Sequence, residues 1–125
     1  MSKIKVIAEV GVNHNGKENY IYKYIDTAKE IGADIVKFQI YNTQELVSRD
    51  AKTANYQILN NSKKISQFDL LKKYEINLKI TKKIINYCKI KKIKSLFTAF
   101  DENSLKMLLK LGCKNFKVSS PDIFD

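Results

Sequence analysis

The sequence predicts an α/β fold in which four parallel strands are connected by helices. Four short apolar runs are separated by segments whose apolar residues recur at the spacing of a helix. Nearly continuous apolar runs are typical of strands in parallel sheets. One predicted helix also ends only two residues before the next strand, as is usual in βαβ units. The order is βα-βα-βα-β, and we expect right-handed crossovers between the strands.

The first half of the chain predicts two strands with a helix between them. We expect strands over 5–10 and 34–40. The helix is indicated by an apolar stripe over 21–31, and Gly32 is expected to end it as a C′ residue. The loop 11–16, which joins the first strand to the helix, is rich in Gly and Asn, residues that tolerate unusual backbone angles.

The middle of the chain begins with a segment that has no clear period. Residues 41–66 are rich in Asn, Thr, Ser and Lys, and a loop of this length in a compact domain is often a lid or a binding loop. A short helix is expected over 67–73. A second apolar stripe over 78–88 predicts another helix, and a strand is expected over 94–98.

The last part of the chain predicts one more helix and the fourth strand. Asp101 is the expected N-cap of this helix and Gly112 its end. The strand is expected over 115–119, and Pro121 is expected to break regular structure. We see no linker, repeat or low-complexity segment, so residues 1–125 are expected to form one domain.

Composition excludes several classes of function. The formal charge is +10, but the basic residues are nearly all lysines spread along the chain, and Arg49 is the only arginine. Arginine provides the forked contacts of base and phosphate readout, so we expect no nucleic-acid partner. No apolar run is long enough to cross a membrane, and the first residues do not resemble a signal peptide, so a cytoplasmic protein is expected. Cys88 and Cys113 are expected to be buried, reduced thiols.

Polar side chains occur at the ends of the predicted strands, where parallel α/β proteins bind ligands. Lys37 and Lys117 would give a positive field suited to a phosphate or carboxylate, with hydroxyl groups from Thr98, Ser119 and Ser120. Glu9 would then contact sugar hydroxyls or transfer a proton. The alternative is that Glu9 simply forms an ion pair with one of the two lysines.

His14 is the only histidine, and it lies in the loop after the first strand. Two roles are open for it: a hydrogen bond that stabilises the loop, or a contact with substrate. One histidine does not make a metal site. The segment 13–16 also lacks the glycine spacing of a nucleotide-binding loop.

Several segments together resemble the sialic acid synthase family, which comprises N-acetylneuraminate, legionaminate and pseudaminate synthases. Residues 7–16, IAEVGVNHNG, resemble its opening motif, and residues 32–39, GADIVKFQ, its second-strand motif. The remaining similarity lies in the connecting region and in the third and fourth strands: Asn55-Tyr56-Gln57, Ser66-Gln67, 70–75, 96–101 and 116–120. The connecting region is closer to the legionaminate and N-acetylneuraminate branches.

The resemblance implies a transferase of carbohydrate biosynthesis with a (β/α)8 TIM barrel. In the family, C3 of phosphoenolpyruvate attacks the aldehyde of an N-acetylated hexosamine of the N-acetylmannosamine type, water adds at C2, and phosphate leaves to give a nonulosonic acid. A divalent metal, Mn²⁺ or Mg²⁺, activates the aldehyde. An antifreeze-like domain completes the site of the partner subunit in a homodimer.

The resemblance also implies roles for individual residues. Lys37, Lys117, Thr98 and Ser120 would hold phosphoenolpyruvate. Glu9, Gln39 and Asp122 would face the sugar, and Glu9 is the best candidate for proton transfer. Asn13 and His14 belong to the opening motif and are further candidates for substrate binding. Two positions depart from the pattern: Ala99 replaces a proline, and Pro121-Asp122 replaces glycine followed by an acidic residue.

The length of the chain limits what it is expected to do alone. The sequence stops just after the fourth predicted strand, whereas a complete barrel needs roughly 200 residues or more. We therefore expect the N-terminal half of a TIM barrel, without the second half, the metal ligands or the antifreeze-like domain, and inactive by itself. The alternative is a non-catalytic anion-binding half-barrel, or a fragment that pairs with a partner chain.

Overall fold

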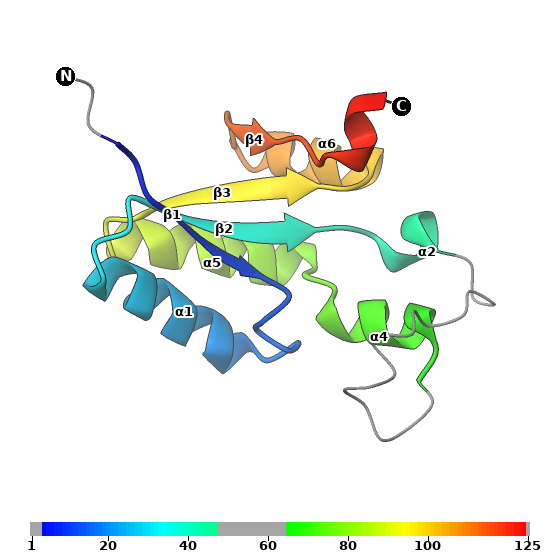
Figure 1. Ribbon diagram of the computed structural model, residues 1–125, viewed down its shortest axis with the longest axis horizontal. Coiled ribbons are helices and arrows are strands. Elements are labelled where there is room, and N and C mark those ends of the chain that lie inside the picture. The colour runs from blue at the N-terminus through cyan, green and yellow to red at the C-terminus, as the bar shows by residue number, and fades with distance from the viewer. Residues whose placement is uncertain (1–3, 48–64, 125) are drawn as a thin grey trace.

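The computed structural model describes residues 4–47 and 65–124, and it contains the predicted parallel sheet. Its four strands are adjacent in the order β1-β2-β3-β4, and each pairs in parallel with the next (Figure 1). The strands are β1 (Ile7–Gly11), β2 (Ile35–Ile40), β3 (Lys94–Ala99) and β4 (Phe116–Lys117). The α/β fold class is therefore confirmed.

The helices between the strands are those that the apolar stripes predict. They are α1 (Glu18–Glu30), α5 (Leu78–Ile90) and α6 (Glu102–Lys110). Helix α1 contacts β1 and β2, while α5 and α6 contact β3. Three shorter elements complete the described part of the chain: α2 (Thr43–Leu46), α4 (Gln67–Tyr74) and the 3₁₀ helix η1 (Pro121–Phe124).

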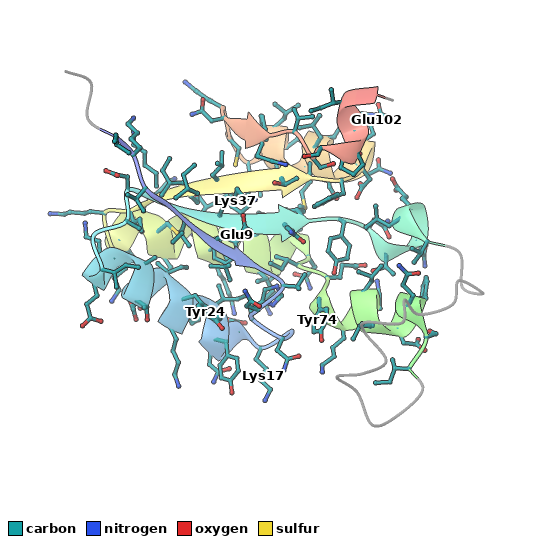
Figure 2. The ribbon with its side chains drawn as sticks, in the orientation of Figure 1. Glu9, Lys17, Tyr24, Lys37, Tyr74 and Glu102 are labelled. Carbon is teal, nitrogen blue, oxygen red and sulfur yellow. The ribbon has the colours of Figure 1, made fainter. Side chains whose placement is uncertain are left out.

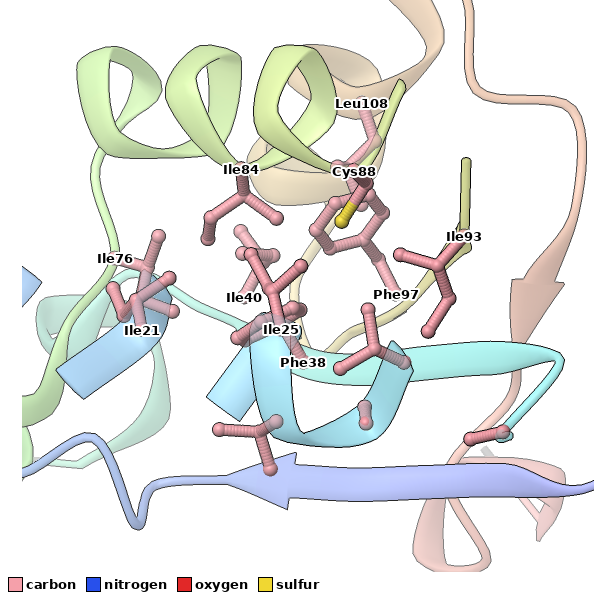
Figure 3. Packing of buried hydrophobic residues seen from close by; sticks show 14 residues of the cluster. Ile21, Ile25, Phe38, Ile40, Ile76, Ile84, Cys88, Ile93, Phe97 and Leu108 are labelled. Atoms are coloured by element: carbon pink, nitrogen blue, oxygen red, sulfur yellow. The ribbon is translucent and has the colours of Figure 1, made fainter. Parts of the chain in front are cut away.

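The hydrophobic core lies between the sheet and the helices (Figure 3). Side chains alternate along β2, so that Val36, Phe38 and Ile40 are buried against the helices. The rest of the cluster comes from the neighbouring strands, from one stripe of each of the three helices and from the short connections before β2, α5 and β3: Val10, Ile21, Ile25, Ala28, Ala33, Ile76, Ile84, Cys88, Ile93, Phe97 and Leu108. The apolar residues that recur every second position in the strands and every 3.6 positions in the helices therefore pack together in one core.

The predicted helix ends are also present. The Asp101 side chain accepts a hydrogen bond from the Ser104 N–H, which makes it the N-cap of α6. Gly32 and Gly112 follow α1 and α6 with φ of +80° and +81°, the left-handed conformation that glycine adopts without strain.

The C-terminal segment differs from the prediction. The strand expected over 115–119 is only two residues long, because the Ser119 hydroxyl bonds to the Asp122 carboxylate and the chain turns away. Pro121 does not end regular structure but begins η1, since its fixed φ suits the first position of a helix.

Smaller differences lie at the other predicted elements. The first strand covers 7–11 rather than 5–10. The predicted loop 41–66 contains the short helix α2, capped by the side chain of Asn42, and its residues 48–64 lie outside the described part, including Asn55, Tyr56 and Gln57. Cys88 is buried as expected, while Cys113 is only partly buried. No helix in the described residues is long and apolar enough to cross a membrane.

Candidate functional site

The face of the sheet opposite the helices carries the polar residues that the sequence places at the strand ends. The strand register fixes their positions. Glu9 on β1 is paired with Lys37 on β2, and one step nearer the C-terminal ends Gln39 on β2 is paired with Thr98 on β3. Thr98 is paired in turn with Lys117 on β4. Because paired residues of a parallel sheet share a face, these five side chains form two adjacent rows, which we call the polar face.

Lys37 is the central group of the polar face. Its ammonium forms an ion pair with the Glu9 carboxylate (Figure 2) and lies 3.4 Å from the Thr98 hydroxyl. The Lys37 side chain is 14% exposed, whereas that of Glu9 is 45% exposed. Thr98 is buried, so its hydroxyl is a fixed acceptor for the lysine. The ion pair that the sequence left as an alternative is therefore present, and it leaves the carboxylate open to solvent.

Gln39 lies beside this ion pair at a point where β1 bends. The pairing of β1 with β2 shifts between Glu9 and Gly11, and Gly11 has φ of +53°. A Cβ atom at position 11 would lie 3.5 Å from Glu9 Oε1 and 3.7 Å from Gln39 Nε2. Because Gly11 has no side chain, the Glu9 carboxylate and the Gln39 amide can both lie close to the backbone at position 11. The sequence alone does not reveal this role, although a glycine directly after the predicted strand over 5–10 is its signal.

Lys117 contrasts with Lys37. It is exposed, and no ion pair or hydrogen bond links its ammonium to another described residue. Ser120 is exposed beyond the strand, and its carbonyl accepts from Ile123. Asp122 accepts the Ser119 hydroxyl, so its carboxylate is held near the end of β4. The structure thus places Lys117 on the polar face, with Ser120 and Asp122 in the turn that follows.

His14 is buried in the loop after β1. Its Nδ1 accepts a hydrogen bond of 3.1 Å from the Gly16 N–H, so the predicted loop contact is present. The neutral ring then carries its proton on Nε2, which has no partner among the described residues. Burial lowers the pKa of His14 and favours this neutral form. Asn13 is exposed beside it, and its backbone N–H bonds to Val10.

The loops at the C-terminal ends of the strands are fixed to each other by carboxylates. The Asp101 carboxylate accepts hydrogen bonds from Ser104. It also accepts one of 2.7 Å from the backbone N–H of Asn42 in the loop after β2. Glu75 accepts from the N–H and hydroxyl of Thr43, and so links α2 to the end of α4.

The Glu75 link persists to acidic pH. Burial alone would raise the pKa of the Glu75 carboxyl, but the bonds from Lys72 and Thr43 outweigh burial and lower it. The sequence identified Asp101 only as a cap and did not identify Glu75, because such links depend on which loops the fold brings together.

The described residues do not form a metal site of their own. No group of three or more His, Cys, Asp or Glu side chains comes together within 4–47 and 65–124. His14, the only imidazole, already uses Nδ1 for Gly16. The donor set therefore does not fit the divalent metal that the resemblance implies, and no chemistry of this chain is assigned to a metal.

Comparison with known proteins identifies the family. The model of the NeuB family matches residues 24–125, which is most of the chain. The chain belongs to the NeuB family. This confirms the resemblance to the sialic acid synthases and assigns the four strands to the N-terminal part of a TIM-barrel enzyme.

Two relatives of this NeuB-family chain are named N,N'-diacetyllegionaminic acid synthase. It is 42% identical to the N,N'-diacetyllegionaminic acid synthase of Campylobacter jejuni over 98% of the chain and 37% of that protein. It is 36% identical to the enzyme of the same name from Legionella pneumophila, over 94% of the chain and 33% of that protein. The chain thus spans about a third of the length of these curated relatives.

A solved structure of a relative shows the same fold. The N-acetylneuraminic acid synthetase of Leptospira borgpetersenii superposes with a TM-score of 0.79 at 30% identity, over 98% of the chain and 38% of that protein. The spore coat polysaccharide biosynthesis protein SpsE of Bacillus subtilis superposes with a TM-score of 0.62 at 28% identity.

Proposed function

We propose that this chain forms the phosphoenolpyruvate-binding part of a synthase that makes a nonulosonic acid of the legionaminate or N-acetylneuraminate type. The complete enzyme would condense phosphoenolpyruvate with an N-acetylated hexosamine and release phosphate. Membership of the NeuB family and the names of the relatives support this reaction class. The observation that carries the proposal is the polar face: Lys37 and Lys117 lie on one side of the sheet, and Thr98 is paired with Lys117 and accepts a hydrogen bond from Lys37.

The charges of the polar face suit a small molecule with two anionic groups. Two ammonium groups and one carboxylate leave a net positive charge, and the hydroxyl of Thr98 is close enough to Lys37 to bind the same oxygen. Glu9 already holds Lys37, so this ammonium is positioned before ligand arrives. Phosphoenolpyruvate carries a phosphate and a carboxylate, which would engage Lys37, Lys117 and, beyond β4, Ser120.

The remaining polar residues would serve the sugar. C3 of phosphoenolpyruvate forms a bond to the aldehyde carbon, water adds at C2, and the C2–O bond to phosphate breaks, so that the products are a nonulosonic acid and inorganic phosphate. Glu9, whose carboxylate is open to solvent, would transfer a proton to or from the reacting groups. Gln39 beside it, Asp122, and Asn13 and His14 in the adjacent loop would contact the sugar.

The rest of the enzyme lies outside the described residues. We propose that further strands of the barrel supply the ligands of Mn²⁺ or Mg²⁺, which would polarise the aldehyde, and that the complete enzyme is a cytoplasmic homodimer with an antifreeze-like domain. Residues 1–125 would then be the N-terminal part of the barrel domain. These features follow from the family resemblance.

A titration of the chain with phosphoenolpyruvate, followed by ³¹P NMR, tests the proposal. We expect saturable binding, and we expect Lys37→Met to weaken it at least about tenfold because a charge-assisted hydrogen bond is lost. Lys110→Met removes an exposed lysine on α6 and serves as the matched control. The proposal is wrong if the chain does not bind phosphoenolpyruvate or if both variants weaken binding equally.

A phosphate-release assay distinguishes an enzyme part from an anion-binding module. With phosphoenolpyruvate, N-acetylmannosamine and Mn²⁺, the chain alone is expected to bind without turnover. Supplying the missing part of a NeuB-family barrel should restore phosphate release, and Glu9→Gln should abolish it while phosphoenolpyruvate binding persists. Binding without turnover even in the completed barrel would favour the non-catalytic module.

A further inference from the structure

A second group of charged side chains lies at the opposite end of the sheet from the strand ends that carry the candidate site. The turns from α1 to β2 and from α5 to β3 lie there, at the end of the strands away from the arrowheads (Figure 1). Between the two turns is a cavity of about 470 Å³, a volume within the range of small-molecule sites. Four lysines line this cavity, and we call them the basic cluster: Lys29, Lys89, Lys92 and Lys94.

The positive charge of this cavity is not neutralised by the residues that line it. Among the described residues of the lining, one is acidic: Asp34, whose carboxylate accepts a hydrogen bond from the Val6 N–H. Four ammonium groups and one carboxylate therefore leave three positive charges. Within residues 4–47 and 65–124, no ion pair engages the ammonium groups of Lys89, Lys92 and Lys94. These groups are free to bind an anion.

The two turns are joined to each other by hydrogen bonds. The backbone N–H of Lys94 donates one of 3.3 Å to the carbonyl of Asp34, which connects the start of β3 to the residue before β2. The Lys29 ammonium reaches across from α1 and donates one of 3.0 Å to the carbonyl of Lys92. The backbone around the basic cluster is therefore preorganised, which reduces the conformational freedom that a ligand has to restrict when it binds.

The backbone of Lys92 gives an independent indication that a lysine is needed at this place. Helices α1, α5 and α6 are each followed, directly after the C-cap, by a residue in the left-handed conformation. This residue is Gly32 after α1 and Gly112 after α6, but it is Lys92, with φ of +53°, after α5. A side chain is strained in this conformation, whereas glycine is not. Strained residues of this kind cluster at functional sites.

Compensation of the helix dipole accounts for only part of the basic cluster. Lys29 and Lys89 lie in the last turns of α1 and α5, where a positive charge stabilises a helix. Lys92 lies beyond the end of α5, where Lys89 already provides this charge, and a glycine would avoid the strain. Lys110 lies in the last turn of α6 but does not line the cavity, so it is a matched control for the dipole effect.

We propose that the basic cluster binds a small molecule that carries two or more linked phosphate groups. One phosphate group provides at most about two negative charges and would leave part of the positive charge unmatched, whereas linked phosphates provide more. Lysine suits such a chain because its ammonium binds phosphate as a point charge with three N–H donors. The site is distinct from the polar face, since Lys94 lies four residues from Thr98 along β3, roughly 13 Å at the rise of a strand. The proposal does not rest on the proposed function.

Titration of the chain with tripolyphosphate, followed by isothermal titration calorimetry at constant ionic strength, tests the proposal. We expect one equivalent to bind, with pyrophosphate and phosphate binding progressively more weakly. In ¹⁵N-edited NMR, the amide signals of residues 32–34 and 92–94 should shift. A titration with ATP separates two sources of the ligand, and both support the proposal. Equal affinities for ATP and tripolyphosphate indicate a phosphate chain alone, while tighter binding of ATP indicates a nucleotide.

Two variants of the basic cluster separate binding from folding. Lys92→Gly removes one charge and also relieves the strain, so it should weaken tripolyphosphate binding at least about tenfold without lowering the Tm. Lys89→Met combined with Lys94→Met removes two charges and should weaken binding further. Lys110→Met should change the affinity by less than about twofold, because salt screens exposed charges that lie away from the ligand.

Four results would overturn the proposal. The chain does not bind tripolyphosphate, or it binds several equivalents without saturation. Lys92→Gly and Lys110→Met weaken binding equally, which would assign the affinity to the lysine-rich surface as a whole. Binding is lost in Lys37→Met, which would place the anion on the polar face. The proposed function fails separately, because phosphoenolpyruvate binding should persist in Lys92→Gly whether or not tripolyphosphate binds.

Discussion

The two faces of the sheet differ in the burial and the polarity of their side chains. On the helix-covered face, Val36, Phe38 and Ile40 are at most 1% exposed and belong to the same core cluster as residues of α1, α5 and α6. On the opposite face, Lys37 and Gln39 of the same strand lie among other polar side chains, and the Glu9 carboxylate is half exposed. The same strand therefore buries apolar side chains in the core on one face and presents partly exposed polar side chains on the other.

Because successive side chains of β2 point to opposite faces, residues that stabilise the fold alternate with residues of the candidate site. Even-numbered positions of β2 bury apolar surface, which is the main favourable term in folding. On the other side of the strand, Lys37 and Gln39 place polar groups at the end of the sheet where parallel α/β proteins bind ligands. A substitution at Val36, Phe38 or Ile40 should therefore change the free energy of unfolding, while one at Lys37 or Gln39 should change ligand binding.

The largest effect is expected from breaking the helix-covered face. Phe38→Ala removes a fully buried ring and should lower the free energy of unfolding by about 3–5 kcal/mol, measured by urea denaturation. Ile90→Ala, at an exposed apolar residue, should change it by less than about 0.5 kcal/mol. Equal effects of the two variants would show that the core is not where we place it.

A smaller effect is expected from the loops at the strand ends. Asp101→Ala removes the N-cap of α6 and the acceptor for the Asn42 N–H, and should cost about 1–3 kcal/mol of unfolding free energy. Asp101→Asn keeps an acceptor for the cap and should cost less. A loss of the same size in both variants would argue against the capping role.

His14 should make stability depend on pH. Its folded pKa lies below the ordinary value of 6.5, so below about pH 6.5 the unfolded chain binds a proton that the folded chain does not. As the pH is lowered from 6.5 to the folded pKa of His14, the free energy of unfolding should therefore decrease, by at most about 1.4 kcal/mol per pH unit. His14→Gln should flatten this part of a denaturation series; an unchanged slope would assign it to other groups.

The smallest change in stability is expected on the polar face. Lys37→Met breaks the ion pair with Glu9, but the carboxylate stays half exposed and hydrated, so the free energy of unfolding should change by less than about 1 kcal/mol. The same variant should bind phosphoenolpyruvate at least about tenfold more weakly. A large loss of stability with unchanged binding would reverse the assignment of the two faces.

Much of the fold is predictable from the sequence because local patterns and burial agree. The stripe over 21–31 and the apolar run over 34–40 predict α1 and β2 within a few residues, and Asp101 and Gly112 mark both ends of α6. The fourth strand was predicted too long, because residues 118 and 119 fit a strand by type. Its length is set by the Ser119–Asp122 hydrogen bond and by having only β3 as a neighbour in the described sheet.

The site is predictable in its composition but not in its connections. Alternation places Lys37 and Gln39 on one side of a strand, and the end of an apolar run marks Glu9. The sequence left open whether Glu9 pairs with a lysine, and the answer depends on the register of β1 against β2. The links from Asp101 to Asn42 and from Glu75 to Thr43 join loops far apart in the chain, so no local pattern reveals them.

The central claim is that the ammonium groups of Lys37 and Lys117 bind the same small dianion. Lysine side-chain ¹⁵N signals, followed during a titration of the chain with phosphoenolpyruvate, test it most directly. We predict that both signals shift together and reach saturation with one dissociation constant at one equivalent of ligand. Signals that saturate at different concentrations, or a shift of Lys117 or Lys37 alone, would contradict the account.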